Sequence, residues 1–331
     1  MANNVINRQS NKGKSGDKPG MHYQKRDGDI IELIYEYDGV LAKRHIKERF
    51  WPNASERAML RRLSLLVLHG FLARPEKRQW WSRPIREAIY WIGWRGALWL
   101  AAQRGIYIDP PKNEGENQMR KLQRSLREHG IYWLREPRWS MIGHELAIDD
   151  FRISFESSVN QIAWINSEQW VRESEFRSHM DTIKFSVEGK NGKIEQRKRG
   201  VCPDGLVVIE DIKRKLRGEP HRLPLLLEID MASHDNSSFA RDKVAPYVAY
   251  IKSSEFKTRF GLNGGYWLIV TSGERRMKNL MNQTERIARR EAPFFFFTTF
   301  HELKANILID PIWFQAGKSN PVSLISGNDN R

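Results

Sequence analysis

Three carboxylates lie at the ends of two apolar segments in the second half of the chain. Asp204 precedes the apolar segment GLVVIE, and Glu228 and Asp230 end the run LPLLLEID. Residues two apart on a strand point to the same face, and acidic groups at the ends of buried strands are costly unless they are paired or bind a cation. Because oxygen ligands suit Mg²⁺ and Mn²⁺, the pattern predicts a metal site formed by Asp204, Glu228 and Asp230.

A lysine beside such a site would orient an attacking water and offset the charge of a scissile phosphate. Lys243, on the helical segment that follows the acidic strand, is the candidate for this role.

The same residues have structural alternatives. Asp204 precedes a glycine, as turn residues often do, and Glu228 and Asp230 are candidates for an ion pair with Arg241 or Lys243. Structural roles are favoured over ligation or reactivity for four further side chains near these segments: His144, Cys202, His234 and Asp235.

Strand-like and helical segments alternate across residues 141–316. The predicted strands cover 201–210, 223–230, 266–273 and 293–300, and the predicted helices cover 143–158, 239–256 and 273–291. A polar, basic hairpin is predicted over 188–200. Such alternation predicts an α/β fold, with a mixed sheet covered by helices on both faces.

The first hundred residues show a different order of elements. Helical spacing predicts helices over 29–39, 40–50 and from Asn53 or Ser55 to Gly70, then a short β-hairpin within 71–82 and a helix over 93–104. Three helices followed by a two-stranded wing is the order of a winged helix-turn-helix domain, whose third helix would read DNA. The predicted DNA-binding residues, which include two arginines of the second half, are Ser55, Arg57, Arg61, Arg62, Lys77, Arg78, Arg275 and Arg276.

The charge distribution favours the same end of the molecule for DNA binding. The net charge is +15, and residues 1–140 carry 27 Lys and Arg against 15 Asp and Glu, whereas residues 141–331 carry 28 against 25. A basic module joined to a nearly neutral domain is typical of a protein that binds a polyanion. The alternatives are a winged helix that contacts protein, with Arg61 and Arg62 solvated, and structural bonds of Arg275 and Arg276 to nearby helix ends.

The composition limits the class of protein. A hydrophobic fraction of 40% fits a folded chain, and a single cysteine excludes a disulfide framework within it. Apolar runs stay shorter than the ~20 residues that a membrane span needs, and the N-terminus lacks the apolar core of a secretory signal. We therefore expect a cytoplasmic protein without a membrane partner.

The carboxylate pattern resembles the PD-(D/E)xK nuclease core. A helix with Glu145, then Pro203-Asp204, then Glu228-Ile229-Asp230 stand in the order of that fold, which implies a restriction-endonuclease-like α/β domain. The motif departs from the pattern at one position, because Asp230 stands where the nucleases carry lysine. The resemblance therefore implies an atypical Glu-x-Asp site for metal-dependent cleavage of DNA, with Lys243 as the shifted lysine and Glu145 as an auxiliary carboxylate. The catalytic set that it implies is Glu145, Asp204, Glu228, Asp230 and Lys243.

A wider resemblance covers nearly the whole chain. The winged-helix segment, residues 144–148, Pro203-Asp204, residues 227–230, Lys243 with Tyr247, and residues 274–276 are similar to the replication-relaxation family of plasmids and mobile elements. Together with the patterns above, it predicts a disordered basic arm at 1–26, a winged helix at 27–105, a helical connector at 106–140, a nuclease-like domain at 141–316 and a flexible tail at 317–331.

Three functions follow from these patterns. The first is a DNA-binding protein of a mobile element that acts in replication or relaxation, with double-stranded DNA and other plasmid replication or mobilisation proteins as partners. The second is a Mg²⁺- or Mn²⁺-dependent nickase or endonuclease. The third is a non-catalytic regulator whose α/β domain binds a protein or forms a homodimer.

Overall fold

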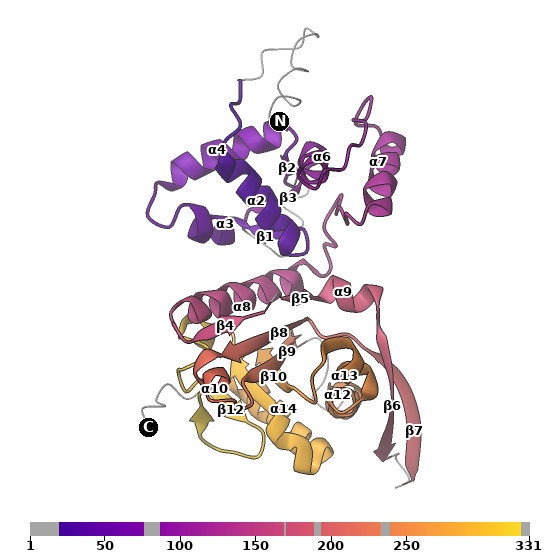
Figure 1. Ribbon diagram of the computed structural model, residues 1–331, viewed down its shortest axis with the longest axis vertical. Helices are drawn as coiled ribbons and strands as arrows, with labels where there is room; N and C mark the ends of the chain where they lie inside the picture. The colour runs from indigo at the N-terminus through magenta and orange to yellow at the C-terminus, as the bar shows by residue number, and fades with distance from the viewer. Residues whose placement is uncertain (1–19, 76–86, 169, 189–192, 233–238, 326–331) are drawn as a thin grey trace. The chain divides into compact units, whose positions relative to one another are not determined.

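The computed structural model describes residues 20–75, 87–168, 170–188, 193–232 and 239–325. It contains two compact units, Met1–Leu146 and Ala147–Arg331 (Figure 1). The division falls inside helix α8 (Ile142–Asn160), a few residues beyond the boundary expected at 140/141. Within the described residues, every helix is too short or too polar to cross a membrane.

The N-terminal unit combines helices with a small antiparallel sheet. Its first six elements are α2 (Lys25–Glu36), β1 (Val40–Ala42), α3 (Lys43–Phe50), α4 (Glu56–Leu68), β2 (Leu72–Ala73) and β3 (Ile89–Ile92). The sheet order is β1-β3-β2. Helices α6 (Trp94–Gln103) and α7 (Glu116–Glu128) follow. The core of this unit includes Ile30, Ile34, Leu63 and Leu66, which are fully buried and lie at helical spacing on α2 and α4.

Two predictions for this unit were wrong in detail. Residues Val40–Ala42 do not begin a helix but form β1, because all three are buried and pair with β3. The partner of β2 is β3, beyond the predicted hairpin at 71–82. The short strands carry no period-2 alternation, since every residue of β1 and β3 is buried. Most of the predicted wing, with Lys77 and Arg78, lies outside the described residues.

The C-terminal unit is built on an eight-stranded mixed sheet, which confirms the predicted α/β class. The sheet order is β13-β12-β11-β10-β9-β8-β4, with β5 also paired to β8. Strand β9 is antiparallel to β8 and parallel to β10, and β10 is parallel to β11. The strands are β4 (Ile165–Ser167), β5 (Val171–Arg172), β8 (Gly205–Asp211), β9 (Arg222–Asp230), β10 (Tyr266–Thr271), β11 (Phe295–Thr299), β12 (Trp313–Gln315) and β13 (Pro321–Val322). Strand β13 lies inside the segment expected to be a flexible tail.

Apolar side chains cover both faces of this sheet. On one face, Phe151 and Phe155 of α8 pack with the odd-numbered residues Leu227 and Ile229 of β9. On the other face, the core contains Leu226 together with side chains of several helices. These are α9 (Glu173–Ser178), the π-helical turn η2 (Ala240–Val244), α12 (Ala245–Ile251), α13 (Ser254–Phe260) and α14 (Glu274–Ala288). Glu228 and Asp230 alternate with Leu227 and Ile229, so they belong to this second face.

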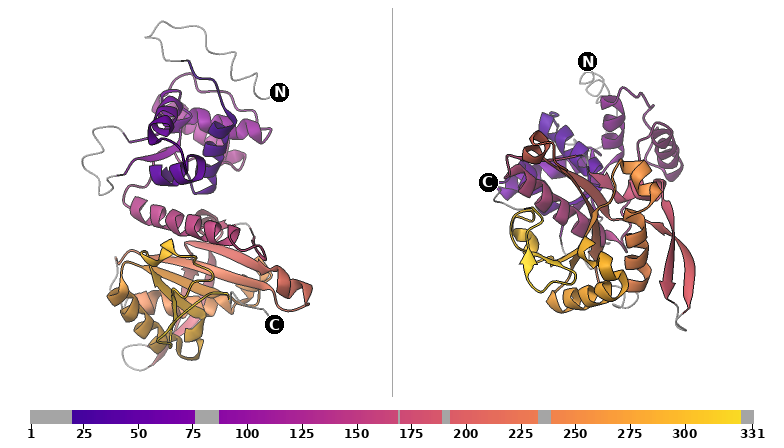
Figure 2. Two further views of the ribbon diagram at one scale, coloured as in Figure 1. Left: turned by 90° about the vertical axis from the view of Figure 1, so that its left-hand side faces the viewer. Right: turned by 60° about the horizontal axis from the view of Figure 1, so that its bottom comes forward.

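A two-stranded ribbon completes the unit. Strands β6 (Asp181–Glu188) and β7 (Ile194–Val201) pair with each other in antiparallel register. The hairpin predicted over 188–200 included most of β7 but only the last residue of β6, so the ribbon begins earlier than expected. The ribbon packs against α12 and lies on the far side of that helix from the central sheet (Figures 1 and 2). Short elements α10 (Ile212–Leu216), η3 (Arg289–Phe294) and η4 (Glu302–Lys304) connect or extend the larger ones.

Candidate active site

Asp204 is held at the point where β8 begins beside the end of β9. Its backbone N–H donates to the carbonyl of Leu227 at 3.0 Å, and its Oδ2 accepts from the backbone N–H of Ile229 at 2.6 Å. The residue is 5% exposed. A Cβ at Gly205 would lie 2.2 Å from the Trp170 ring, so only glycine allows this ring to cover the start of β8. Asp204 is therefore a buried carboxylate in a fixed position.

Glu228 is the most buried carboxylate of the predicted set. It is 1% exposed, and both of its oxygens have partners. Lys243 Nζ donates to Oε1, and the hydroxyl of Tyr247 donates to Oε2. The Tyr247 ring stacks on Trp267 with 3.6 Å between ring centroids. The structure thus brings Lys243 onto the acidic strand.

The position of Lys243 depends on an irregular turn. Residues Ala240–Val244 form a π-helical turn that continues into α12. Pro246 has no N–H with which to bond the carbonyl four residues earlier, so a regular α-helical pattern cannot run unbroken through this turn. Turns of this kind occur often at functional sites. Lys243 and Tyr247, four residues apart, reach Glu228 from the same side.

Burial and neighbouring charges act in opposite directions at this pair. Burial is the main reason that the pKa of Glu228 is raised to about 7, and the charge of Asp204 adds to it. The nearby ammonium of Lys243 opposes the rise without cancelling it. Burial also acts to lower the pKa of Lys243, but the charges of Glu228 and Asp204 outweigh it and raise that pKa. These effects keep Lys243 charged, and they favour the protonated form of Glu228 more than water would.

Asp230 has different partners from those of Glu228. Arg276 of α14 donates from Nε to Oδ2 and from Nη2 to Oδ1, both at 2.9 Å, and Thr271 Oγ1 donates to Oδ2 at 2.7 Å. Burial acts to raise the pKa of Asp230, but these hydrogen bonds and the Arg276 charge lower it. Arg276, a predicted phosphate contact, is thus ion-paired with a buried residue, whereas its neighbour Arg275 is exposed.

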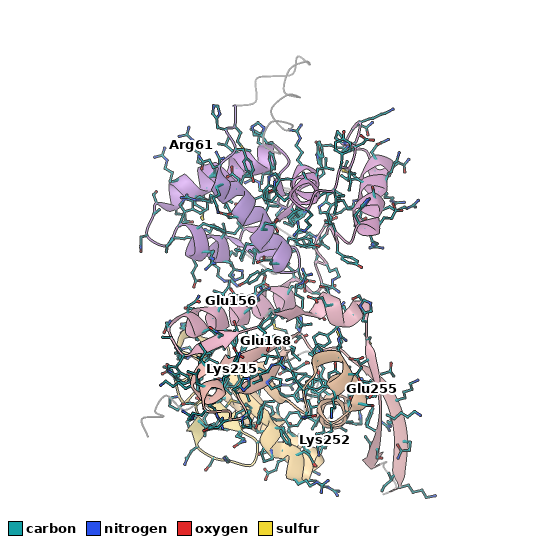
Figure 3. The ribbon with its side chains drawn as sticks, viewed as in Figure 1. Arg61, Glu156, Glu168, Lys215, Lys252 and Glu255 are labelled. Carbon is teal, nitrogen blue, oxygen red and sulfur yellow. The ribbon has the colours of Figure 1, made fainter. Side chains whose placement is uncertain are left out.

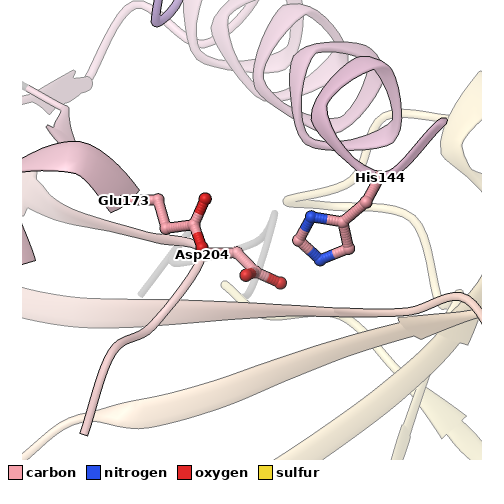
Figure 4. Close-up of side chains that lie close together, drawn as sticks. All are labelled: His144, Glu173 and Asp204. Carbon is pink, nitrogen blue, oxygen red and sulfur yellow. The ribbon is translucent and has the colours of Figure 1, made fainter. Parts of the chain in front are cut away.

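A second group of potential ligands meets at Asp204. His144, Glu173 and Asp204 each offer one ligand atom, and these atoms all lie within 4.8 Å of one another (Figure 4). His144 stands in the first turn of α8, and Glu173 is the first residue of α9. The Glu173 carboxylate also accepts from Arg177 Nε at 2.9 Å. Sequence reasoning assigned His144 to a structural role and did not consider Glu173.

The other side chains near the site are in structural contacts. Glu145 accepts from Arg138 Nη2 at 2.8 Å. Cys202 is half-buried, and burial is the main reason that its pKa is raised to about 11, so its thiol stays protonated. His234 and Asp235 lie outside the described residues.

The predicted DNA-binding residues of α4 differ in their surroundings. Ser55, Arg57 and Arg61 are exposed, and Arg61 lies on the outer surface of the helix (Figure 3). Arg62 faces the interior of the unit, where it donates from Nε to Asp27 Oδ1 at 2.7 Å. Its side chain is 13% exposed and that of Asp27 is fully buried. Arg62 therefore connects α4 to the start of α2.

Comparison with known proteins supplies one finding about the family. No curated protein and no solved structure matches the chain. The model of the replication-relaxation family matches residues 32–265, which is more than half of the chain and includes the segments with Asp204, Glu228 and Lys243. The chain therefore belongs to the replication-relaxation family, and this membership supports a role in the replication or relaxation of mobile elements.

Proposed function

We propose that this protein binds DNA of a mobile element and cleaves a phosphodiester bond in it at the site formed by Asp204, Glu228 and Lys243. The observation that carries the proposal is the contact of Lys243 with Glu228 beside Asp204. A nuclease of the resembled class needs an ammonium next to two buried carboxylates. Here a different element, the π-helical turn, supplies that ammonium in place of the residue at position 230.

Each side chain of the site has a role that its surroundings support. Lys243 remains charged and would offset the negative charge that develops on the scissile phosphate. Glu228 orients Lys243, and its pKa of about 7 suits it to accept a proton from an attacking water near neutral pH. Asp204 is fixed by the Ile229 N–H, so its remaining oxygen has little freedom to move.

The side chains that would hold a metal ion are Asp204, Glu173 and His144. When bound, a divalent cation would polarise the phosphate and lower the pKa of a coordinated water. A donor set of two carboxylates and one imidazole fits Mn²⁺ better than Mg²⁺, which prefers oxygen ligands alone. The partners of Glu228 and Asp230 leave those two carboxylates less suited to ligation than the sequence pattern alone predicts.

Plasmid nicking tests the proposed activity. Supercoiled plasmid is incubated with the full chain in Mn²⁺, in Mg²⁺ or in chelator. The fractions of open-circular and linear plasmid are then quantified on a gel. We expect nicking in Mn²⁺ that Asp204→Asn lowers at least ~100-fold. Glu210→Gln is the matched control, because Glu210 lies near the far end of β8, the strand whose start Asp204 precedes. If wild type and Asp204→Asn give the same plasmid forms, the site has no nuclease activity and a non-catalytic role takes its place.

DNA binding is assigned in this proposal to the N-terminal unit as a winged helix. The order of α2, β1, α3, α4, β2 and β3 supports it, as does the exposure of Arg57 and Arg61 on α4. Arg62 is left out of the proposed contact surface, because it is ion-paired with Asp27. The expected partner is double-stranded DNA, and phosphate contacts should make the affinity depend steeply on salt.

A further inference from the structure

Strand β6 has one face turned to the core and one face exposed, whereas β7 is exposed at every residue from Ile194 to Arg199. Ile183 and Phe185 alternate along β6 and are buried, 3% and 8% exposed, on the side that packs against α12. The residues between and beside them, Thr182, Lys184 and Ser186, are exposed. Because side chains alternate along a strand, these three belong to the opposite face, which we call the outer face.

The register of the ribbon completes the outer face. Thr182 pairs with Gly200, Lys184 with Lys198, and Ser186 with Gln196. Gln196 Nε2 donates to Ser186 Oγ at 2.8 Å. These three pairs carry two cations and neutral polar groups, and none of their six residues is acidic. The next pair of the register, Glu188 with Ile194, falls on the same face at the end of the ribbon, where Ile194 is exposed.

The Lys184–Lys198 pair needs an explanation beyond the fold. Side chains directly opposite on antiparallel strands have Cβ atoms ~4.5–5.5 Å apart, and like charges in such a pair are destabilising. Among the described residues neither lysine has an ion pair, in contrast to Arg197 and Arg199 on the inner face, which pair with Glu195 and Asp242. Two adjacent unneutralised cations fit a surface that meets a polyanion.

We propose that the outer face of the β6–β7 ribbon binds the phosphate backbone of duplex DNA. The eight residues of each strand span ~27 Å, and a two-stranded ribbon fits the major groove, which is ~12 Å wide. Charge complementarity favours nucleic acid, because Lys184 and Lys198 lie side by side in the middle of the outer face, between pairs that carry hydrogen-bonding groups. This inference rests on the proposed function, and it adds a second DNA contact in the C-terminal unit.

The ribbon connects directly to the candidate active site. Strand β7 ends at Val201, and only Cys202 and Pro203 separate it from Asp204. Six residues therefore join Lys198 to Asp204, which limits their Cα separation to ~22 Å. DNA held on the outer face would thus lie within about one helical turn (~34 Å) of the proposed site of cleavage, independently of where the N-terminal unit binds.

Salt-dependent binding to a 30-base-pair duplex tests this contact. The full chain is compared with Lys184→Gln/Lys198→Gln and with Lys257→Gln/Lys304→Gln, a control that removes the same charge from exposed positions elsewhere in the unit. We expect the first variant to bind about tenfold more weakly and to lose about 1.8 from the slope of log affinity against log salt, because each phosphate contact contributes about 0.9. Lys184→Arg/Lys198→Arg should retain the wild-type slope.

The melting temperature separates a binding role from a structural one. Removing two opposed like charges should leave the melting temperature unchanged or higher, so weaker binding cannot come from unfolding. Equal slopes for Lys184→Gln/Lys198→Gln and for the control would show that the ribbon does not contact DNA. If Arg57→Ala/Arg61→Ala lowers the slope in the same experiment, DNA binding by the N-terminal unit still holds, and so does the proposed function. If the wild-type chain shows no affinity for the duplex, the DNA-binding function itself is wrong.

Discussion

Glu228 and Asp230 are two carboxylates on one face of one strand, yet their surroundings give them opposite chemistry. Glu228 meets a lysine and a tyrosine, and its pKa is raised to about 7, chiefly by burial. Asp230 meets a bidentate arginine and a threonine, and its pKa is lowered despite burial. Position on the strand therefore does not decide the direction in which the pKa of a carboxylate shifts.

The difference comes from the elements that face each residue. Lys243 reaches Glu228 as a single ammonium from the irregular turn η2, and Asp204 adds a second negative charge nearby. Arg276 reaches Asp230 from the regular helix α14 with two parallel hydrogen bonds, which is a geometry that fixes a carboxylate as an anion. We infer that the Glu228 end is built for proton exchange and the Asp230 end for stability.

The largest expected effect concerns stability at the Asp230 end. Asp230→Ala leaves the half-buried Arg276 without its partner, so the free energy of unfolding should fall by ~3–5 kcal/mol. Urea denaturation followed by circular dichroism measures this change. Asp230→Leu combined with Arg276→Met should recover most of the loss, because both charges are then absent. A loss below ~1 kcal/mol for Asp230→Ala would show that this pair does not stabilise the fold.

The next effect concerns activity at the Glu228 end. Lys243→Met removes the ammonium, and we expect the single-turnover rate of plasmid nicking to fall ~10²–10³-fold, as for other groups that stabilise charge in a transition state. The fold should tolerate the change better than Asp230→Ala, because Glu228 can take up a proton. Lys243→Arg should restore part of the rate. Nicking at the wild-type rate by Lys243→Met would exclude a role of the ammonium in the reaction.

The pKa of Glu228 also makes stability depend on pH. It is raised from 4.5 to about 7 in the folded state, so above pH 4.5 the folded protein binds more protons than the unfolded chain. The free energy of unfolding should therefore fall as pH rises from about 4.5 to about 7, by roughly 3 kcal/mol at most. Urea titrations across this range measure the slope. Glu228→Gln should flatten it, and an unchanged slope in that variant would assign it to other groups.

The smallest effect applies the same comparison to two adjacent arginines of α4. Arg61 is exposed, so Arg61→Ala should weaken duplex binding a few-fold and leave the unfolding free energy within ~0.5 kcal/mol of wild type. Arg62 is paired with the buried Asp27, so Arg62→Ala should chiefly lower stability. Fluorescence anisotropy and thermal melting distinguish the two. Equal losses of stability in both variants would contradict the assignment.

The sequence was informative where its patterns were long. Apolar runs such as residues 223–230 and their alternation with helical segments were enough to predict the α/β class, since burial of such runs requires a sheet covered on both faces. The same pattern predicted that Lys243 would contact the acidic strand. The reason is that β9 leads into the helical segment with Lys243 after a short connection.

Very short strands and contacts between distant segments could not be predicted from the sequence. β1 and β5 have three and two residues, too few for a periodic signal, so neither β1 nor the placement of Glu173 at the end of β5 could be predicted. The pairing of Asp230 with Arg276 joins residues 46 positions apart, and only the parallel register of β9 and β10 brings α14 close enough. Such contacts depend on the assembled sheet.

One measurement compares the two ends of the site directly. Single-turnover nicking of supercoiled plasmid in Mn²⁺ is followed for the wild type, for Glu228→Gln and for Thr271→Val, which removes a hydrogen bond to Asp230 without changing charge or volume. We expect Glu228→Gln to lower the rate at least ~100-fold and Thr271→Val to lower it less than ~3-fold. Equal rates for the two variants would contradict the assignment of proton exchange to Glu228 and of stability to Asp230.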